Sequence, residues 1–302
     1  MRRWLLGAAW VTLPLTAGPG IAEGLRTWGG APQVVGSVLC WLAWGLALLA
    51  CLAPRPLGLT VARAVAPAGV VLAVVVAARG DTSTVAAGGA IAATLVAAVL
   101  VADPAFAEVA ANAVSYGDEQ RYPLRVPPGL FLGPLPLARA VVVGGLVAGP
   151  LLLADGQLVW GVVALAIGLP AAAVAAQVLH RLSRRWIVVV PAGVVVVDPM
   201  TLADNVLFPR EHVEVLRGLR GDEEPGGALD LRLGATLGSV LFVFDEPPEL
   251  TKTLRARRRA ETVKAPALLV AVAHRHAMLA SAARRRVRIE VTDPGASAQP
   301  VP

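Results

Sequence analysis

Histidine side chains occur at two places where they could bind a metal ion or transfer a proton. His212 and Glu214 form a His-x-Glu triplet with Val213, but the Pro-Cys-x-x-Cys sequence that completes a zinc deaminase site does not occur in the chain. His274 and His276 flank Arg275, whose positive charge disfavours a cation between them. The sequence also contains no GxxxxGK[ST] phosphate loop, no HExxH and no GxSxG. We therefore expect no metal and no cofactor.

A second group of side chains that could bind a ligand or take part in catalysis lies in the polar segment from Ser115 to Arg125. Long loops in compact proteins are more often functional than connective. The alternative is a solvated loop whose charged side chains pair with one another or with lipid headgroups. The candidate interaction surface consists of Asp118, Glu119, Arg121, Tyr122 and Arg125. An enzyme would have to bring Asp118, Glu119 and His212 to one pocket at the membrane surface.

Two clusters of arginine near the C-terminus are candidates for contact with anionic lipid. The first contains Arg255, Arg257, Arg258 and Arg259, and the second contains Arg284, Arg285, Arg286 and Arg288. Near an anionic membrane each such residue contributes about 1 kcal/mol of attraction. Aromatic residues do not alternate with these arginines, which disfavours binding of nucleic acid by base stacking. A solvated or acid-paired face is the alternative.

These side chains must be positioned by a chain that is unusually apolar. Of its 302 residues, 56% are hydrophobic and 16% are charged, against about 25% charged in soluble domains. A helix needs about 20 apolar residues to cross the hydrocarbon core. We predict about six transmembrane helices within residues 1–182, at about 4–21, 34–53, 59–78, 84–102, 138–153 and 158–178.

Arginine positions predict the orientation, because basic loops stay on the cytoplasmic side. With the N-terminus inside, ten arginines of the membrane half face the cytoplasm: Arg2, Arg3, Arg55, Arg63, Arg121, Arg125, Arg139, Arg181, Arg184 and Arg185. Only Arg26 and Arg79 face outward. Both termini and the loop 103–137 are then cytoplasmic, in a multi-pass protein of the plasma membrane. The first segment also resembles a cleaved signal peptide, an alternative that leaves the later topology unchanged.

After Arg185 the pattern becomes strand-like, which predicts a cytoplasmic β-rich domain over residues 183–290. Valine-rich runs at 186–190 and 194–197 flank a Pro-Ala-Gly turn. Further strands are expected at 206–208, 212–216, 229–233, 240–244 and 268–272, and a helix at about 277–287. Residues 291–302 are expected to be a disordered tail.

The order of "RRWIVVVPAGVVVVDP", "VLFPREHVEVLRG", "ALDLRL", "GSVLFVF" and a late helix resembles bacterial pleckstrin-homology-like domains. Together with "SYGDEQRYPLR", the chain resembles uncharacterised actinobacterial multi-pass integral membrane proteins. That resemblance implies an α+β fold for the second domain and no known activity. Pleckstrin-like folds usually bind lipids, peptides or themselves.

Taken together, these features favour a membrane scaffold or accessory protein with a pleckstrin-like module that binds a protein or an anionic lipid. The spans carry no Asp, Glu or Lys at their centres, where ion paths usually have them. A transporter of small molecules or lipids with a neutral pathway is the alternative, and a membrane-embedded enzyme is the third. No nucleic acid partner is expected. The sequence does not specify the ligand, the physiological process or the oligomeric state.

Overall fold

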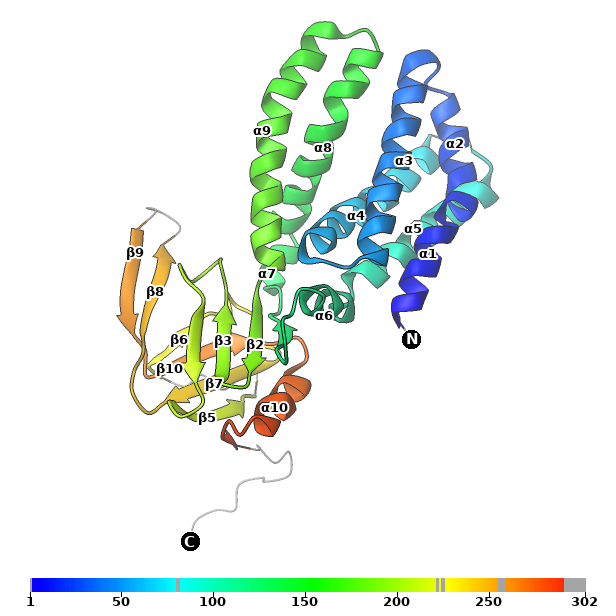
Figure 1. The fold of residues 1–302 in the computed structure, drawn as a ribbon. Helices are drawn as coiled ribbons and strands as arrows, with labels where there is room; N and C mark the ends of the chain where they lie inside the picture. Colours follow the sequence, from blue (N-terminus) through cyan, green and yellow to red (C-terminus); the bar gives the residue numbers. More distant parts are fainter. Residues whose placement is uncertain (1, 80–81, 221–222, 224–225, 255–258, 291–302) are drawn as a thin grey trace. The chain divides into compact units, whose positions relative to one another are not determined.

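The structure is a computed structural model that describes residues 2–79, 82–220, 223, 226–254 and 259–290. The chain divides into two compact units. A helical unit contains residues 1–114 and 131–183, and a β-rich unit contains residues 115–130 and 184–302. Figure 1 shows both units, which are described separately below.

The helical unit is built from long apolar helices. They are α1 (Arg2–Thr16), α2 (Gly18–Arg26), α3 (Gly30–Leu52), α4 (Pro56–Ala78), α5 (Thr84–Ala102), α8 (Pro134–Ala154) and α9 (Leu158–Ser183), with a short α6 (Pro104–Asn112). Within the described residues, six segments are long and apolar enough to cross a membrane: Trp4–Arg26, Gly30–Leu52, Pro56–Ala78, Thr84–Ala102, Pro128–Ala154 and Leu158–Ser183. This confirms the predicted multi-pass helical architecture.

Burial in the helical unit is the reverse of that in a soluble bundle. Small residues fill the interior, among them Ala47, Ala62 and Ala97, each at most 1% exposed. Large apolar side chains such as Trp41 and Ile167 are more than half exposed. Small residues let helix backbones approach closely, and apolar surfaces are stable facing hydrocarbon. The packing therefore supports a membrane as the solvent of this unit.

The first span is interrupted between α1 and α2, where the sequence places Pro14, Gly18 and Pro19. Pro14 has no N–H, so the carbonyl of Trp10 loses its normal partner one turn along the helix. The indole Nε1 of Trp44, on α3, donates a hydrogen bond to that carbonyl at 2.7 Å. A side chain from a neighbouring span thus satisfies the backbone group that the proline leaves open.

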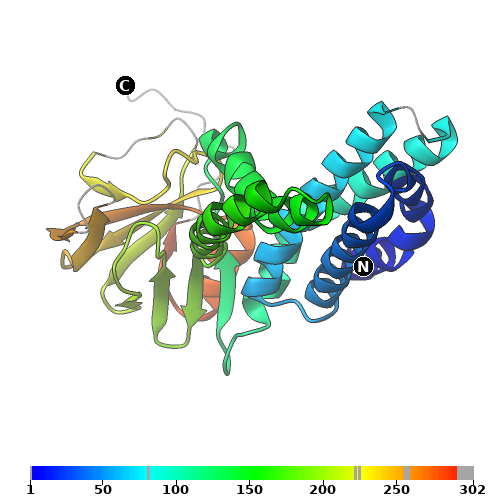
Figure 2. The ribbon, with the colours of Figure 1, turned by 90° about the horizontal axis from the view of Figure 1, so that it is seen from above.

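Glycines bring α8 and α9 into the closest contact of the helical unit, and the two helices run side by side (Figures 1 and 2). A Cβ on Gly145 would collide with the carbonyl oxygen of Gly168, and a Cβ on Gly149 would collide with Leu165. Gly145 and Gly149 have the small-xxx-small spacing that lets helices approach closely, and here they serve packing within the chain.

The β-rich unit contains two sheets and a hairpin. One antiparallel sheet has the order β1 (Gln120–Pro123), β2 (Trp186–Val190), β3 (Gly193–Val197) and β4 (Val206–Pro209). The other sheet has the order β11 (Ile289–Glu290), β5 (Val213–Gly218), β7 (Ser239–Phe244), β10 (Ala267–Ala271) and β6 (Ala228–Asp230). The hairpin pairs β8 (Glu249–Leu254) with β9 (Arg259–Lys264).

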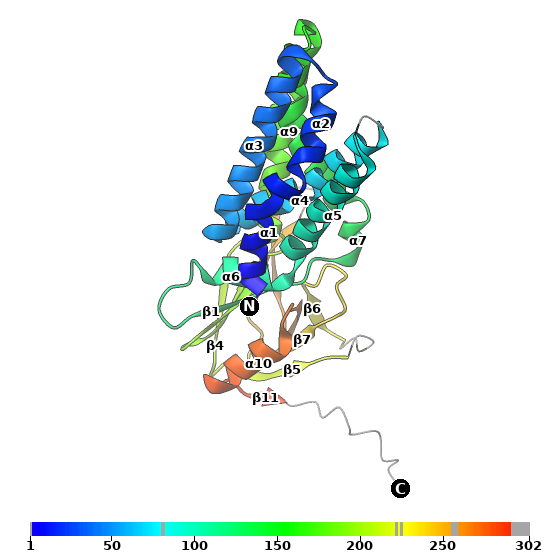
Figure 3. The same ribbon diagram turned by 90° about the vertical axis from the view of Figure 1, so that its right-hand side faces the viewer.

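The core of this unit lies between the sheets and is closed by α10 (Arg275–Arg284) (Figure 3). Phe208 and Phe242 come from different sheets and pack in the core, and Met278 and Ala282 of α10 are fully buried in the same cluster. An isolated bridge between Leu124 and Val272 joins the two sheets at one corner. The expected β-rich C-terminal region is therefore present.

Strand β1 comes from the loop that the sequence places between two spans. It pairs with β2 in the register Gln120 with Val189 and Pro123 with Trp186. The chain then continues through the short α7 (Pro128–Phe131) into α8. The β-rich unit thus includes residues 115–130, which the sequence assigned to the membrane half. In the chain, the α8–α9 hairpin is an insertion between β1 and β2.

Candidate interaction surface

The polar segment around β1 is bound to helix α10 by a network of hydrogen bonds. The Gln120 Oε1 atom accepts hydrogen bonds from Tyr122 Oη at 2.9 Å and Ser281 Oγ at 2.6 Å. Arg285 donates to Ser281 Oγ at 2.8 Å and also to the backbone carbonyl of Asp118. This network fixes the edge strand against the helix that closes the core.

A second set of contacts orders the turn before β1. The carboxylate of Glu119 accepts hydrogen bonds from the backbone N–H of Tyr116 at 2.7 Å and from Arg121 at 2.6 Å. The guanidinium of Arg121 also lies over the ring of Trp186, 5.3 Å from its centroid. Cation–π contacts of this kind stabilise by about 0.5–2 kcal/mol. Glu119 and Arg121 thus pair with each other, as the solvated-loop alternative expected.

The five predicted surface residues differ in how far they are available to a ligand. Tyr122 is 5% exposed and belongs to the core, and Arg125 is partly buried and donates to the carbonyl of Ala273 at 3.3 Å. Glu119 and Arg121 are partly buried, while Asp118 is exposed. Tyr116, which the sequence analysis did not select, is 90% exposed at the tip. Tyr116 and Asp118 are thus the most accessible part of this segment.

The second arginine cluster lies at the end of α10 and before β11. Arg284, Arg286 and Arg288 are exposed, and in the described part of the chain none of them forms an ion pair. Arg286 has a positive φ of 62°, so the backbone turns sharply between its neighbours. Arg285, in contrast, is held in the β1 network. Among the described residues, these three guanidinium groups therefore have no acidic partner and are available to an anionic ligand.

The first arginine cluster falls mostly outside the described residues. Arg255, Arg257 and Arg258 lie there, and Arg259 begins β9. Their predicted contact with anionic lipid stays a prediction.

A buried ion pair that the sequence analysis did not identify holds the start of β2. The Arg185 guanidinium binds both carboxylate oxygens of Asp198 at 2.8 Å, and it also donates to the carbonyl of Leu231 at 2.9 Å. Both side chains are at most 2% exposed. Buried charges persist only when they are paired and hydrogen-bonded, so this bidentate pair fixes the geometry of the strand that follows α9. The sequence analysis used Arg185 only to predict the orientation of the chain in the membrane.

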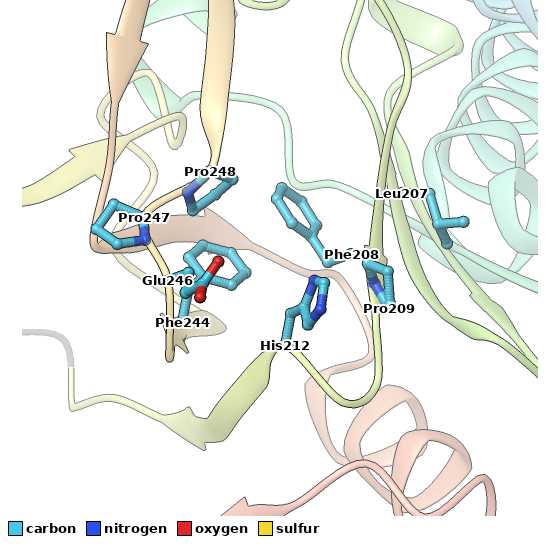
Figure 4. Close-up of a pocket in the computed structure, with 8 residues that line it drawn as sticks. All are labelled: Leu207, Phe208, Pro209, His212, Phe244, Glu246, Pro247 and Pro248. Atoms are coloured by element: carbon cyan, nitrogen blue, oxygen red, sulfur yellow. The ribbon is translucent and has the colours of Figure 1, made fainter.

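His212 lines a small pocket of about 170 Å³ in the β-rich unit (Figure 4). The rings of Phe208 and Phe244 stack with centroids 4.6 Å apart, and Glu246 brings a carboxylate to the same pocket. Pro209, Pro247, Pro248 and Leu207 complete the lining. Asp118 and Glu119 do not line this pocket, so it does not unite the three candidate catalytic residues. Within the described ranges no three His, Cys, Asp or Glu side chains cluster as metal ligands would.

The fold and this surface define a class of protein: a multi-pass helical membrane unit with a β-rich unit into whose sequence a helical hairpin is inserted. Comparisons with protein-family models, with curated proteins and with solved structures gave no match. The resemblance to actinobacterial membrane proteins therefore stays a prediction.

Proposed function

We propose that the chain is an integral membrane scaffold or accessory protein whose β-rich unit is a pleckstrin-homology-like module that binds an anionic ligand at the cytoplasmic surface. The ligand is an anionic lipid or an acidic segment of a protein partner. The observation that carries the proposal is a set of three exposed arginines that form no ion pair within the described ranges: Arg284, Arg286 and Arg288.

The architecture of the unit supports the pleckstrin-like assignment. Four consecutive strands form one antiparallel sheet, a second sheet packs across the core, and a C-terminal helix inserts Met278 and Ala282 into that core. The corner bridge between Leu124 and Val272 joins the two sheets. Domains of this kind usually bind lipids, peptides or themselves, so a binding role agrees with the fold.

The position of the arginines supports an anionic ligand. Arg284 is the last residue of α10, and Arg286 and Arg288 follow it. The neighbouring Arg285 is held by Ser281 and by the carbonyl of Asp118. A rigid attachment reduces the conformational entropy that binding would otherwise cost. Arginine also matches the geometry of phosphate and carboxylate groups.

The test uses the full chain in lipid nanodiscs that contain phosphatidylcholine with or without phosphatidylglycerol. We expect the backbone amides of residues 284–290 to exchange hydrogen more slowly in the anionic discs. The double variant Arg286→Gln/Arg288→Gln should lose this protection. The matched control Arg210→Gln/Arg220→Gln removes the same charge from exposed positions elsewhere in the unit and should keep it.

A photo-crosslinking residue at position 286, used in intact cells, separates the two kinds of ligand. The ligand is an acidic protein partner if a protein crosslink forms that depends on Arg288 and if anionic lipid does not slow hydrogen exchange of residues 284–290 in nanodiscs. If lipid composition leaves the exchange unchanged and no crosslink depends on Arg288, the proposed function is wrong.

A further inference from the structure

Three helices of the helical unit bring basic side chains together at one end of the bundle. Helix α4 packs against both α8 and α9 (Figure 1). Because successive spans alternate in direction, α4 and α8 begin at the end where α9 finishes. At about 1.5 Å per residue, Arg63 lies about 11 Å from the start of α4, Arg139 about 8 Å from the start of α8, and His180 about 5 Å from the end of α9. The three side chains therefore occupy a similar depth.

Contacts within the bundle agree with this placement. Thr60, one helical turn before Arg63, lies with its Oγ1 atom 3.3 Å from His180 Nδ1 on α9. Arg63 and Arg139 lie on α4 and α8, which pack against each other, at about 11 Å and 8 Å from the same end of the bundle. Helices α4, α8 and α9 thus present a polar, positively charged site in an otherwise apolar unit.

Across the part of the chain that the structure describes, no ion pair includes Arg63 or Arg139. The Nε atom of Arg63 donates a hydrogen bond to the carbonyl of Val101, at 3.4 Å near the end of α5. Its two terminal amino groups, which carry most of the donors of a guanidinium, have no hydrogen-bond partner among the residues that the structure describes.

Two like charges in a partly buried site repel each other and are poorly hydrated. A bound anion removes both costs, and arginine forks match the oxygens of a phosphate. Basic pockets between spans are where headgroups of anionic lipids bind to membrane proteins. We propose that Arg63 and Arg139 together bind one phosphate group, carried by the headgroup of an anionic lipid or present as free phosphate, at the end of the bundle where α4 and α8 begin.

This site is independent of the arginine cluster in the β-rich unit, because all of its residues belong to the helical unit. Arg63 also has a structural contact, since its Nε caps a carbonyl at the end of α5. Arg139 makes no such contact in the described chain, so its substitution separates binding from capping.

The experiment measures ligand binding to the delipidated full chain in detergent by native mass spectrometry. The probes are phosphatidylglycerol, phosphatidylcholine and inorganic phosphate. We expect phosphatidylglycerol to bind more tightly than phosphatidylcholine. Arg139→Gln and Arg63→Gln should each weaken phosphatidylglycerol binding by about fivefold, the loss that corresponds to one arginine near an anionic headgroup. Arg63→Lys should retain part of the binding.

The matched control is Arg55→Gln, which removes an exposed arginine just before α4, at the same end of the bundle. It should leave phosphatidylglycerol binding unchanged. If inorganic phosphate binds and the same two substitutions weaken it, the site takes free phosphate. The proposal is overturned if Arg139→Gln binds phosphatidylglycerol as the unmodified chain does, or if Arg55→Gln weakens binding equally.

Discussion

At the scale of single residues, the side chains that determine this structure are those that satisfy groups with no local partner. Trp44 binds the carbonyl that Pro14 leaves open, and Asp198 neutralises Arg185 inside the β-rich unit. The sequence analysis predicted that Arg185 is cytoplasmic, and it predicted neither of these two contacts. The partners were not predictable, because each lies on another element and neither pair has a recognisable spacing in the sequence.

Replacing Trp44 with Phe should destabilise the helical unit, because it removes the indole donor and leaves the carbonyl of Trp10 unpaired in an apolar surrounding. Side-chain hydrogen bonds between spans contribute about 0.6–1.7 kcal/mol. In a Pro14→Ala background the backbone N–H returns, so the same Trp44→Phe change should cost less. The measurement is the free energy of unfolding in a double-mutant cycle in detergent. Equal costs in the two backgrounds would show that the hydrogen bond does not stabilise the fold.

At the scale of helices and strands, the elements that were predicted correctly are those with a clear local sequence pattern. The long apolar runs and the valine-rich strands β2 and β3 were predicted within a few residues of their bounds. Strands β1, β8 and β9 were missed. Strand β1 is Gln-Arg-Tyr-Pro, which has neither β-branched residues nor alternation, and β8 and β9 are rich in Glu, Lys and Thr. Their strand conformation comes from pairing, which no local propensity reveals.

The helical hairpin α8–α9 offers a direct test of close packing. Gly145→Ala should destabilise the hairpin by about 1–3 kcal/mol, because the new methyl group collides with the carbonyl of Gly168. Gly144→Ala is the matched control, since nothing lies within 4 Å of a Cβ there. It should be neutral or should stabilise the helix by about 0.5–1 kcal/mol, as alanine does inside helices. Unfolding of both variants in detergent gives the comparison, and similar stabilities would contradict this packing.

At the scale of the whole molecule, the pairing of β1 with β2 constrains the topology more strongly than arginine counts do. Because the two strands exchange backbone hydrogen bonds, residues 115–130 and 184–290 must lie on the same side of the bilayer. The hairpin between them must then cross the membrane twice or not at all. The arginine bias had predicted the same arrangement, although it assigned residues 115–130 to a loop and not to a sheet.

Single cysteines can test this topology after Cys40 and Cys51 are replaced with Ser. We expect Tyr116→Cys and Leu237→Cys, both exposed in the β-rich unit, to react alike with a membrane-impermeant maleimide. Both should be protected in intact cells and reactive after lysis, if the unit is cytoplasmic. Gln157→Cys, exposed between α8 and α9, should react in intact cells. Labelling of positions 116 and 237 from opposite faces would rule out the β1–β2 pairing.

The insertion of α8 and α9 between β1 and β2 also orders events during synthesis. The ribosome releases Gln120–Pro123 well before Trp186–Val190, and both of the last two spans are translated in the interval. Strand β1 therefore has no β2 partner until both spans have been synthesised and integrated into the membrane. If only one of the two spans is integrated, the bilayer separates the strand from its partner. The β-rich unit therefore matures only when the two spans are integrated together, and its folding acts as a built-in checkpoint on that step.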